Sequence, residues 1–177
     1  TAFITFAYTF WVALDLIYPN IKEANKKLQS ILRIALGLLI VQIIWGAFIA
    51  GLDAGWIHNH WPLMNDGKRI HETVTLEKNP VWKNFVEGKS GVQFIHRYLA
   101  YFVVAIIAYI WFKSRSLLLT IPQKNGINML TGLVLLQFVL GVFTLLLQVP
   151  VWLGVLHQVV AFFLLAALTF TLHRFSK

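Results

Sequence analysis

Residues 37–48 (GLLIVQIIWGAF) and residues 132–143 (GLVLLQFVLGVF) share one pattern of glycine, glutamine and apolar side chains. Each stretch leads to an apolar segment with a histidine near its start, His96 after the first and His157 after the second. The later segments also align, because an alanine follows each histidine after four residues, on the same face of a helix. The sequence therefore predicts one helical hairpin that occurs twice, with one imidazole in each copy.

Long apolar blocks place these hairpins in a membrane. Of the 177 residues, 58% are hydrophobic and 12% are charged, about half the charge of a soluble domain. The mean hydropathy is +0.70. Because a run of about 20 apolar residues crosses a bilayer, we expect four spans and a shorter fifth. They are residues 34–52, 94–112, 127–149 and 152–172, and residues 1–18.

The charged residues predict the orientation of these spans. Basic residues predominate in the loop 19–30, in the loop after residue 112 and in the tail, whereas loop 53–92 has five basic and five acidic residues. Short basic loops face the cytoplasm, or the matrix in a mitochondrion. Loop 53–92 is therefore expected outside. The net charge of +8 does not indicate nucleic-acid binding, because no basic stripe with interleaved aromatic residues occurs.

This orientation makes the internal repeat a parallel one. Copy one covers about 31–113 and copy two about 126–173, and each runs outward and back. Parallel repeats are related by an axis along the membrane normal. The predicted fold is an all-α membrane protein: an antiparallel four-helix transmembrane bundle at 31–177, plus one extra N-terminal helix. The outer connection is long in copy one and only a turn around Pro150 in copy two.

His96 and His157 are candidate iron ligands. Both are expected within about two turns of the outer end of an inward-running helix, so they share one depth, and the pseudo-twofold axis turns them toward each other. Ionisable groups inside a membrane usually face the interior for a functional reason, and imidazole is a common haem ligand. Two facing imidazoles suit a six-coordinate b-type haem. The alternative stays open that each histidine only hydrogen-bonds a neighbouring helix.

Other polar residues of the spans have two readings. Arg97 lies at the outer edge, where it could pair with haem propionates, and an arginine that reaches toward water fits equally well. Gln42 and Gln137 are expected to form hydrogen bonds between helices and are not assigned to haem. The repeated glycines also fit close helix contacts. None of the four long spans contains Asp or Glu, so they offer no acid or base for oxidation chemistry.

The outer loop and the tail contain the remaining histidines. His58 and His60 would share a face on a strand, but two further metal ligands are not evident, so no metal site is expected there. His71 and His173 are expected to be solvated. The chain has no cysteine, which excludes thiolate sites and disulfides within it. At about 40 residues the loop exceeds an ordinary connection, and we expect it to cap the outer end of the bundle.

Three motifs, in order, resemble the C-terminal half of the heme A synthase family of cytochrome oxidase assembly. They are residues 51–55 (GLDAG) followed by 59–64 (NHWPLM), residues 93–97 (QFIHR) and residues 156–158 (LHQ). The resemblance covers the chain from about residue 30 to its end. It implies an eight-helix membrane protein of two similar four-helix halves, which oxidises a methyl group of heme O to the formyl group of heme A.

The resemblance also implies a division of labour. His96 and His157 would hold haem b in this half, while the substrate heme O would bind the other half, whose last helix would be residues 1–18. The chain starts at Thr1 in apolar sequence with no basic region before it, which argues against a signal peptide and predicts a fragment that is not catalytically complete. Catalytic residues are not assigned.

The resemblance further implies partners and a location. Membrane lipid, heme O synthase and cytochrome oxidase assembly factors are the implied partners, and the electron donor is not identified. A bacterial plasma membrane is favoured over a mitochondrial inner membrane. Two other functions stay open: a stand-alone membrane b-type cytochrome for electron transfer, and a structural or assembly protein without haem.

Overall fold

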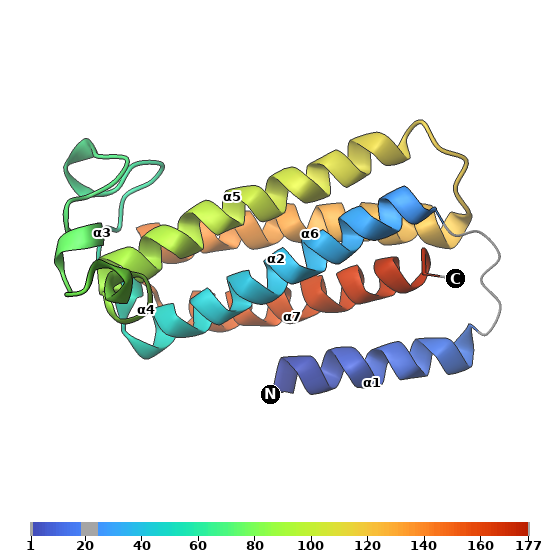
Figure 1. The fold of residues 1–177 in the computed structure, drawn as a ribbon, viewed down its shortest axis with the longest axis horizontal. Coiled ribbons are helices and arrows are strands. Elements are labelled where there is room, and N and C mark those ends of the chain that lie inside the picture. The colour runs from blue at the N-terminus through green and yellow to red at the C-terminus, as the bar shows by residue number, and fades with distance from the viewer. Residues whose placement is uncertain (1, 19–24, 177) are drawn as a thin grey trace. The chain divides into compact units, whose positions relative to one another are not determined.

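The computed structural model describes residues 2–18 and 25–176, and every element among them is helical. A shorter helix, α1 (Ala2–Ile17), precedes four long ones (Figure 1). The long helices are α2 (Lys26–Gly51), α5 (Lys89–Ser114), α6 (Ile121–Leu146) and α7 (Val151–His173). Each of these four is long and apolar enough to cross a membrane. The prediction of four apolar spans with a shorter N-terminal helix is confirmed.

The long helices extend beyond the predicted spans at their polar ends. α2 begins at Lys26, eight residues before the apolar run, and Asn25 caps it by accepting a hydrogen bond from the backbone N–H of Leu28 at 3.1 Å. α6 likewise begins at Ile121. Length alone locates an apolar run, whereas a cap and local backbone bonds decide where the helix begins. Residues 19–24 of the predicted basic loop, together with Thr1 and Lys177, lie outside the described residues.

The chain divides into two compact units. Unit 1 comprises residues 1–39, 103–137 and 159–177, and unit 2 comprises residues 40–102 and 138–158. Consecutive long helices alternate in direction, because α2 and α6 run from unit 1 into unit 2 while α5 and α7 run the opposite way. The loop after α5 belongs to unit 1, and the connections 52–88 and 147–150 belong to unit 2.

Unit 1 contains a packed apolar core. Its helical segments bury side chains at spacings of three and four residues, which places them on one face of each helix. All of the following are less than 5% exposed: Leu28, Leu32, Ala35 and Leu39 of α2; Val103, Ile107 and Ile110 of α5; Ile127, Leu130 and Val134 of α6; Leu164, Leu165 and Leu168 of α7.

α1 packs against α7 within unit 1. The ring centroids of Phe6 and Phe162 are 4.2 Å apart. At the other end of α1, Nε2 of His173 lies 3.1 Å from a carboxylate oxygen of Asp15, and His173 is fully buried. The expectation that His173 is solvated is therefore wrong. Its place beside the basic tail suggested exposure, but Trp11 and Asp15 of α1 contact it.

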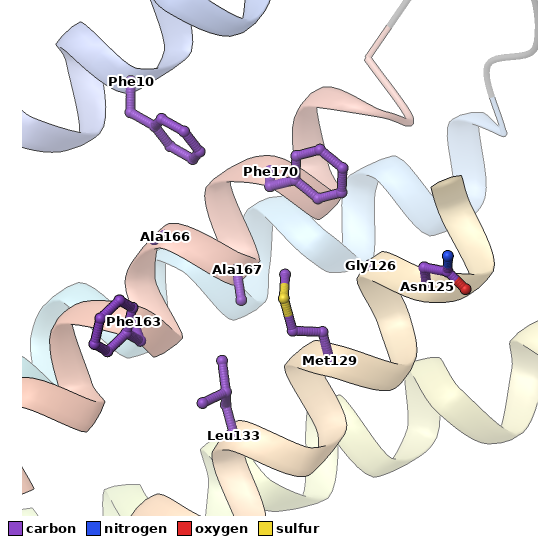
Figure 2. A pocket seen from close by; sticks show the side chains of 9 residues that line it. All are labelled: Phe10, Asn125, Gly126, Met129, Leu133, Phe163, Ala166, Ala167 and Phe170. Carbon is purple, nitrogen blue, oxygen red and sulfur yellow. The ribbon is translucent and has the colours of Figure 1, made fainter. Parts of the chain in front are cut away.

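Unit 1 also has an apolar pocket of about 520 Å³ lined by α1, α6 and α7. Figure 2 shows Phe10 reaching from α1 toward α7, with Phe170 nearby and the small residues Ala166, Ala167 and Gly126 between the larger side chains. Asn125 is the one polar side chain in its lining. The residues that line this pocket include no titratable group.

The helical segments of unit 2 bury very few apolar side chains. After residue 93, only Leu153 is buried among the helical residues of this unit that the structure describes. The large apolar residues there stay open, for example Phe102, which is 62% exposed, and Phe143, which is 51% exposed. Within unit 2 the four long helices therefore expose apolar side chains and have no packed core like that of unit 1.

Connection 52–88 folds into short helices: η1 (Ala54–Trp56), η2 (Asn65–Gly67), α3 (Thr73–Leu76), η3 (Val81–Lys83) and α4 (Asn84–Glu87). Asn84 is fully buried at its centre and donates through Nδ2 to the carbonyls of Thr75, Lys78 and Val81 at 2.9–3.0 Å. Its Oδ1 accepts from the backbone N–H of Lys78 at 2.7 Å. One carboxamide thus satisfies four backbone groups and gives the loop a fixed shape.

Candidate functional site

Each candidate histidine lies against a glycine of the preceding long helix. A β-carbon on Gly46 of α2 would lie 3.2 Å from Cε1 of His96 on α5. A β-carbon on Gly141 of α6 would lie 3.0 Å from Cε1 of His157 on α7. The two helix pairs thus share one contact, in which the missing side chain lets an imidazole approach the neighbouring helix.

The other two repeated glycines have no such contact. A β-carbon on Gly37 or on Gly132 would meet nothing within 4 Å. The sequence left close helix contacts open for all four glycines. The structure separates them, because only Gly46 and Gly141 contact the candidate ligands.

Gln42 holds His96 from α2. Its Nε2 donates to the backbone carbonyl of His96 at 3.1 Å and lies 3.3 Å from Nε2 of the ring. The prediction that Gln42 bonds between helices is confirmed, and its partner is the candidate ligand itself. Nδ1 of His96 is buried and has no hydrogen-bond partner among the described residues. One ring nitrogen therefore has an amide neighbour, while the other has unused bonding capacity.

His157 occupies the same place in α7 as His96 does in α5. His96 is seven residues after Lys89, the first residue of α5, and His157 is six residues after Val151, the first of α7. Both side chains are half-buried. Both belong to unit 2, which therefore holds both candidate ligands.

The helical segments that carry these imidazoles belong to unit 2. The helical segments around them have apolar side chains but almost no buried core, as Phe102 and Phe143 illustrate. Two glycines keep the imidazoles close to the helices. Two nitrogen ligands within apolar walls are the donor set of a bis-imidazole haem.

Arg97, next to His96, contacts the outer loop. Its guanidinium donates to the backbone carbonyls of His58 and, at 3.4 Å, of Leu63. Nε of the same side chain is buried without a hydrogen-bond partner among the described residues. Arg97 therefore fixes the loop above α5 and still has a donor available.

His58 and His71 belong to a buried polar network in this loop. The centroids of the two rings are 4.7 Å apart, and the hydroxyl groups of Thr73 and Ser90 link them. Oγ1 of Thr73 lies 2.8 Å from Nδ1 of His71 and 2.6 Å from Oγ of Ser90. Oγ of Ser90 in turn lies 3.0 Å from Nε2 of His58. His71 also contacts Asp66 at 3.2 Å. The expectation that His71 is solvated is wrong, because folding of the loop brings hydroxyl and imidazole partners to it.

Burial, together with smaller electrostatic contributions from His71 and Arg97, lowers the pKa of His58 from 6.5 to about 4. His58 is therefore neutral at physiological pH. His60 does not join it, since His60 is exposed and bonds Asn65 at 2.8 Å. Among residues 2–18 and 25–176, no three His, Asp or Glu side chains are grouped to hold a metal ion.

Two polar residues, Gln93 and Asn59, were not assigned a role from the sequence. Gln93 is almost fully buried and donates through Nε2 to the carbonyls of Ala54, at 3.0 Å, and Ile57. Asn59 donates to the carbonyls of Gly55 and Leu145, both at 2.8 Å. Both side chains lie within motifs of the resemblance, and this location is the signal that could have marked them.

A comparison with protein families identifies the family of the chain. Residues 1–169 match the family model of COX15-CtaA, described as cytochrome oxidase assembly protein. The chain belongs to this family. The resemblance to the heme A synthases is thereby confirmed.

Individual COX15-CtaA relatives extend the comparison. The heme A synthases of Flavobacterium psychrophilum and Flavobacterium johnsoniae are 60% and 61% identical over 99% of this chain, which covers 52% of each relative. The heme A synthase of Nitrosospira multiformis is 33% identical over 99% of the chain and 50% of its own length. The chain thus spans about half the length of these bacterial relatives. No solved structure matches it.

Proposed function

We propose that the chain is the C-terminal, haem-b-binding half of a heme A synthase. The relatives of this name are about twice as long, which supports a half-length unit. The observation that carries the proposal is the paired contact of Gly46 with His96 and Gly141 with His157. Helix packing alone would not require that both imidazoles have a glycine partner at matching places in the two helix pairs.

His96 and His157 would hold the haem iron. Bound between two imidazoles, a b-type haem supplies reversible one-electron chemistry. Gln42 retains its bond to the carbonyl of His96 and so holds the backbone of this ligand. Nδ1 of His96 has no hydrogen-bond partner among the described side chains, whereas Nε2 lies 3.3 Å from Nε2 of Gln42.

Arg97 and the apolar walls complete the proposed site. Arg97 holds the loop through two carbonyls, and its buried Nε lies where a carboxylate of the cofactor would compensate it. Apolar side chains of unit 2 that face the haem would lose exposed surface against the macrocycle, which would exclude water from the iron.

Oxidation of the heme O methyl group to a formyl group is assigned to the complete protein. α2, α5, α6 and α7 contain no Asp or Glu, so these helices supply no carboxylate for proton transfer. We infer that the chain alone does not convert heme O and that α1 belongs with the other half. Heme O synthase, cytochrome oxidase assembly factors and an electron donor would be its partners in the cell.

A bacterial plasma membrane is the proposed location. The relatives quoted above are bacterial, and the four long helices fit a bilayer. The basic loop after α5 belongs to unit 1, while the connection 52–88, with five acidic and four basic residues, belongs to unit 2. By the positive-inside rule, the basic connections face the cytoplasm and connection 52–88 faces outside.

The ligand assignment is tested by spectroscopy of the purified protein. We expect a sharp reduced α-band of bis-imidazole haem b in the wild type, and its weakening or loss in His96→Ala and in His157→Ala. His60→Ala is the matched control, since His60 is exposed and bonds only within the loop. Wild-type spectra in both ligand variants would refute the assignment. Conversion of heme O by this chain alone would refute the division of labour.

A further inference from the structure

Residues 54–59 form a short segment, named here the outer clasp, that bonds to two helices of unit 2. Gln93 of α5 donates to the carbonyl of Ala54 at 3.0 Å. Asn59 donates through Nδ2 to the carbonyl of Leu145, in the last turn of α6, at 2.8 Å. The outer clasp therefore joins α5, which carries His96, to α6.

Asn59 and Gly55 make the junction tight. Nδ2 of Asn59 also donates to the carbonyl of Gly55 at 2.8 Å, so one carboxamide ties the clasp both to itself and to α6. Gly55 is buried against the turn after α6, where a β-carbon would lie 2.7 Å from Cγ2 of Val149. Val149 has little freedom to yield, because it is branched at Cβ and has a left-handed φ of 54°.

Both bonded ends of the clasp lie within about one helical turn of a candidate ligand or its glycine. Gln93 precedes His96 by three residues, and Leu145 follows Gly141 by four, where Gly141 contacts His157. A shift of the clasp would therefore move α5 relative to α6 at the level of the imidazoles.

Apolar packing does not replace the clasp at this level. The helical segments of unit 2 bury almost no apolar side chains after residue 93. The rings of Tyr101 and Phe138 do join α5 to α6, with centroids 5.5 Å apart, but Tyr101 is 37% exposed and such ring contacts can slide. Directional hydrogen bonds to backbone carbonyls are the more restrictive constraint.

We propose that Asn59 is a positioning residue for the two iron ligands: by bonding the outer clasp to the last turn of α6, it sets the separation of His96 and His157. This inference rests on the proposed function, since it requires haem between the two imidazoles. Asn59 acts through the helices and not on the cofactor. Its loss lets one imidazole leave the iron while the other keeps the haem.

Carbon monoxide binding to the reduced, full-length protein tests this role, because a six-coordinate haem resists the gas and a five-coordinate haem binds it. Asn59→Asp is the sharpest variant, since the aspartate has the same shape but cannot donate to the two carbonyls when ionised. Asn65→Asp is the matched control, because Asn65 lies in the same loop and bonds only His60 and the loop backbone. We expect at least about tenfold more of the carbon monoxide complex in Asn59→Asp than in Asn65→Asp, as for other supporting shells of metal ligands. The low-spin electron paramagnetic resonance signal of Asn59→Asp should also shift relative to that of the wild type.

Each outcome decides between the two proposals. A wild type without bis-imidazole haem refutes the proposed function and this inference with it. A normal wild-type spectrum with no carbon monoxide binding and an unshifted signal in Asn59→Asp refutes the inference alone. If Asn59→Asp loses its helical circular dichroism, Gly55→Ala is measured in its place. The added methyl group would collide with Val149 and so displace the outer clasp from α6. An unshifted signal in that variant likewise refutes the inference.

Discussion

Gly141 and His157 are so close that a β-carbon on the glycine would lie 3.0 Å from Cε1 of the imidazole. A real side chain at that place would require the ring to move by a few tenths of an ångström. Gly46 has the same relationship with His96, at 3.2 Å. These contacts give the two glycines a role that Gly37 and Gly132 do not have.

Gly46→Ala and Gly141→Ala should therefore weaken haem binding by about tenfold, the effect usual for residues that support a metal ligand. The measurement is the rate of haem transfer to apomyoglobin. Gly37→Ala and Gly132→Ala are matched controls in the same helices, where an added methyl group meets nothing within 4 Å. Equal transfer rates in all four variants would show that the contacts do not support the ligands.

The depressed pKa of His58 predicts how stability changes with pH. Because its pKa falls from 6.5 to about 4 on folding, the unfolded chain binds a proton between these values that the folded chain excludes. The free energy of unfolding should decrease as pH falls from 6.5 to 4, and this contribution should level off below 4. His58→Gln removes it, and thermal unfolding of both proteins across this range measures the difference.

The matched variant is His60→Gln, which alters the exposed histidine of the same loop. It should keep the pH dependence of the wild type. If His58→Gln and the wild type lose stability in parallel between pH 6.5 and 4, His58 is not the group that excludes the proton.

The contact between Asp15 and His173 predicts that Asp15 contributes more to the free energy of unfolding than Asp66 does. Asp15→Ala should lower the free energy of unfolding by about 1–3 kcal/mol, because it removes a hydrogen-bond partner of a fully buried imidazole. Asp66→Ala removes an equivalent contact with His71, but the Asp66 side chain is 71% exposed, so its effect should stay within about 1 kcal/mol. Unfolding in detergent, followed by circular dichroism, compares them, and equal effects would contradict the role of Asp15.

Apolar length and repeated spacing were sufficient to predict the long helices, whereas only two of the four repeated glycines, Gly46 and Gly141, lie at a close helix contact. Gln42 is a further success, since a glutamine in a membrane helix must find a partner. The partner itself, the backbone carbonyl of His96, was not predictable, because it depends on the rotation of two helices about their axes. His173 shows the same limit, as its burial depends on α1, which is distant in sequence.

The outer loop was the least predictable part. No periodicity marks Asn84, yet it satisfies four backbone groups, and Gly91 faces it so closely that a β-carbon there would lie 2.2 Å from its carbonyl oxygen. Such contacts join residues whose positions are set only after the loop has folded. Asn59 belongs to the same class, since its partner Leu145 is 86 residues away.

The contrast between the packed helical segments of unit 1 and the open ones of unit 2 has a consequence for biogenesis. Residues such as Leu32 and Leu168 can bury their surface as soon as the helices meet, whereas Phe102 and Phe143 cannot. A ligand that binds only the folded chain adds its binding energy to stability. We therefore expect maturation in two stages, in which delivery of the cofactor is the last folding step.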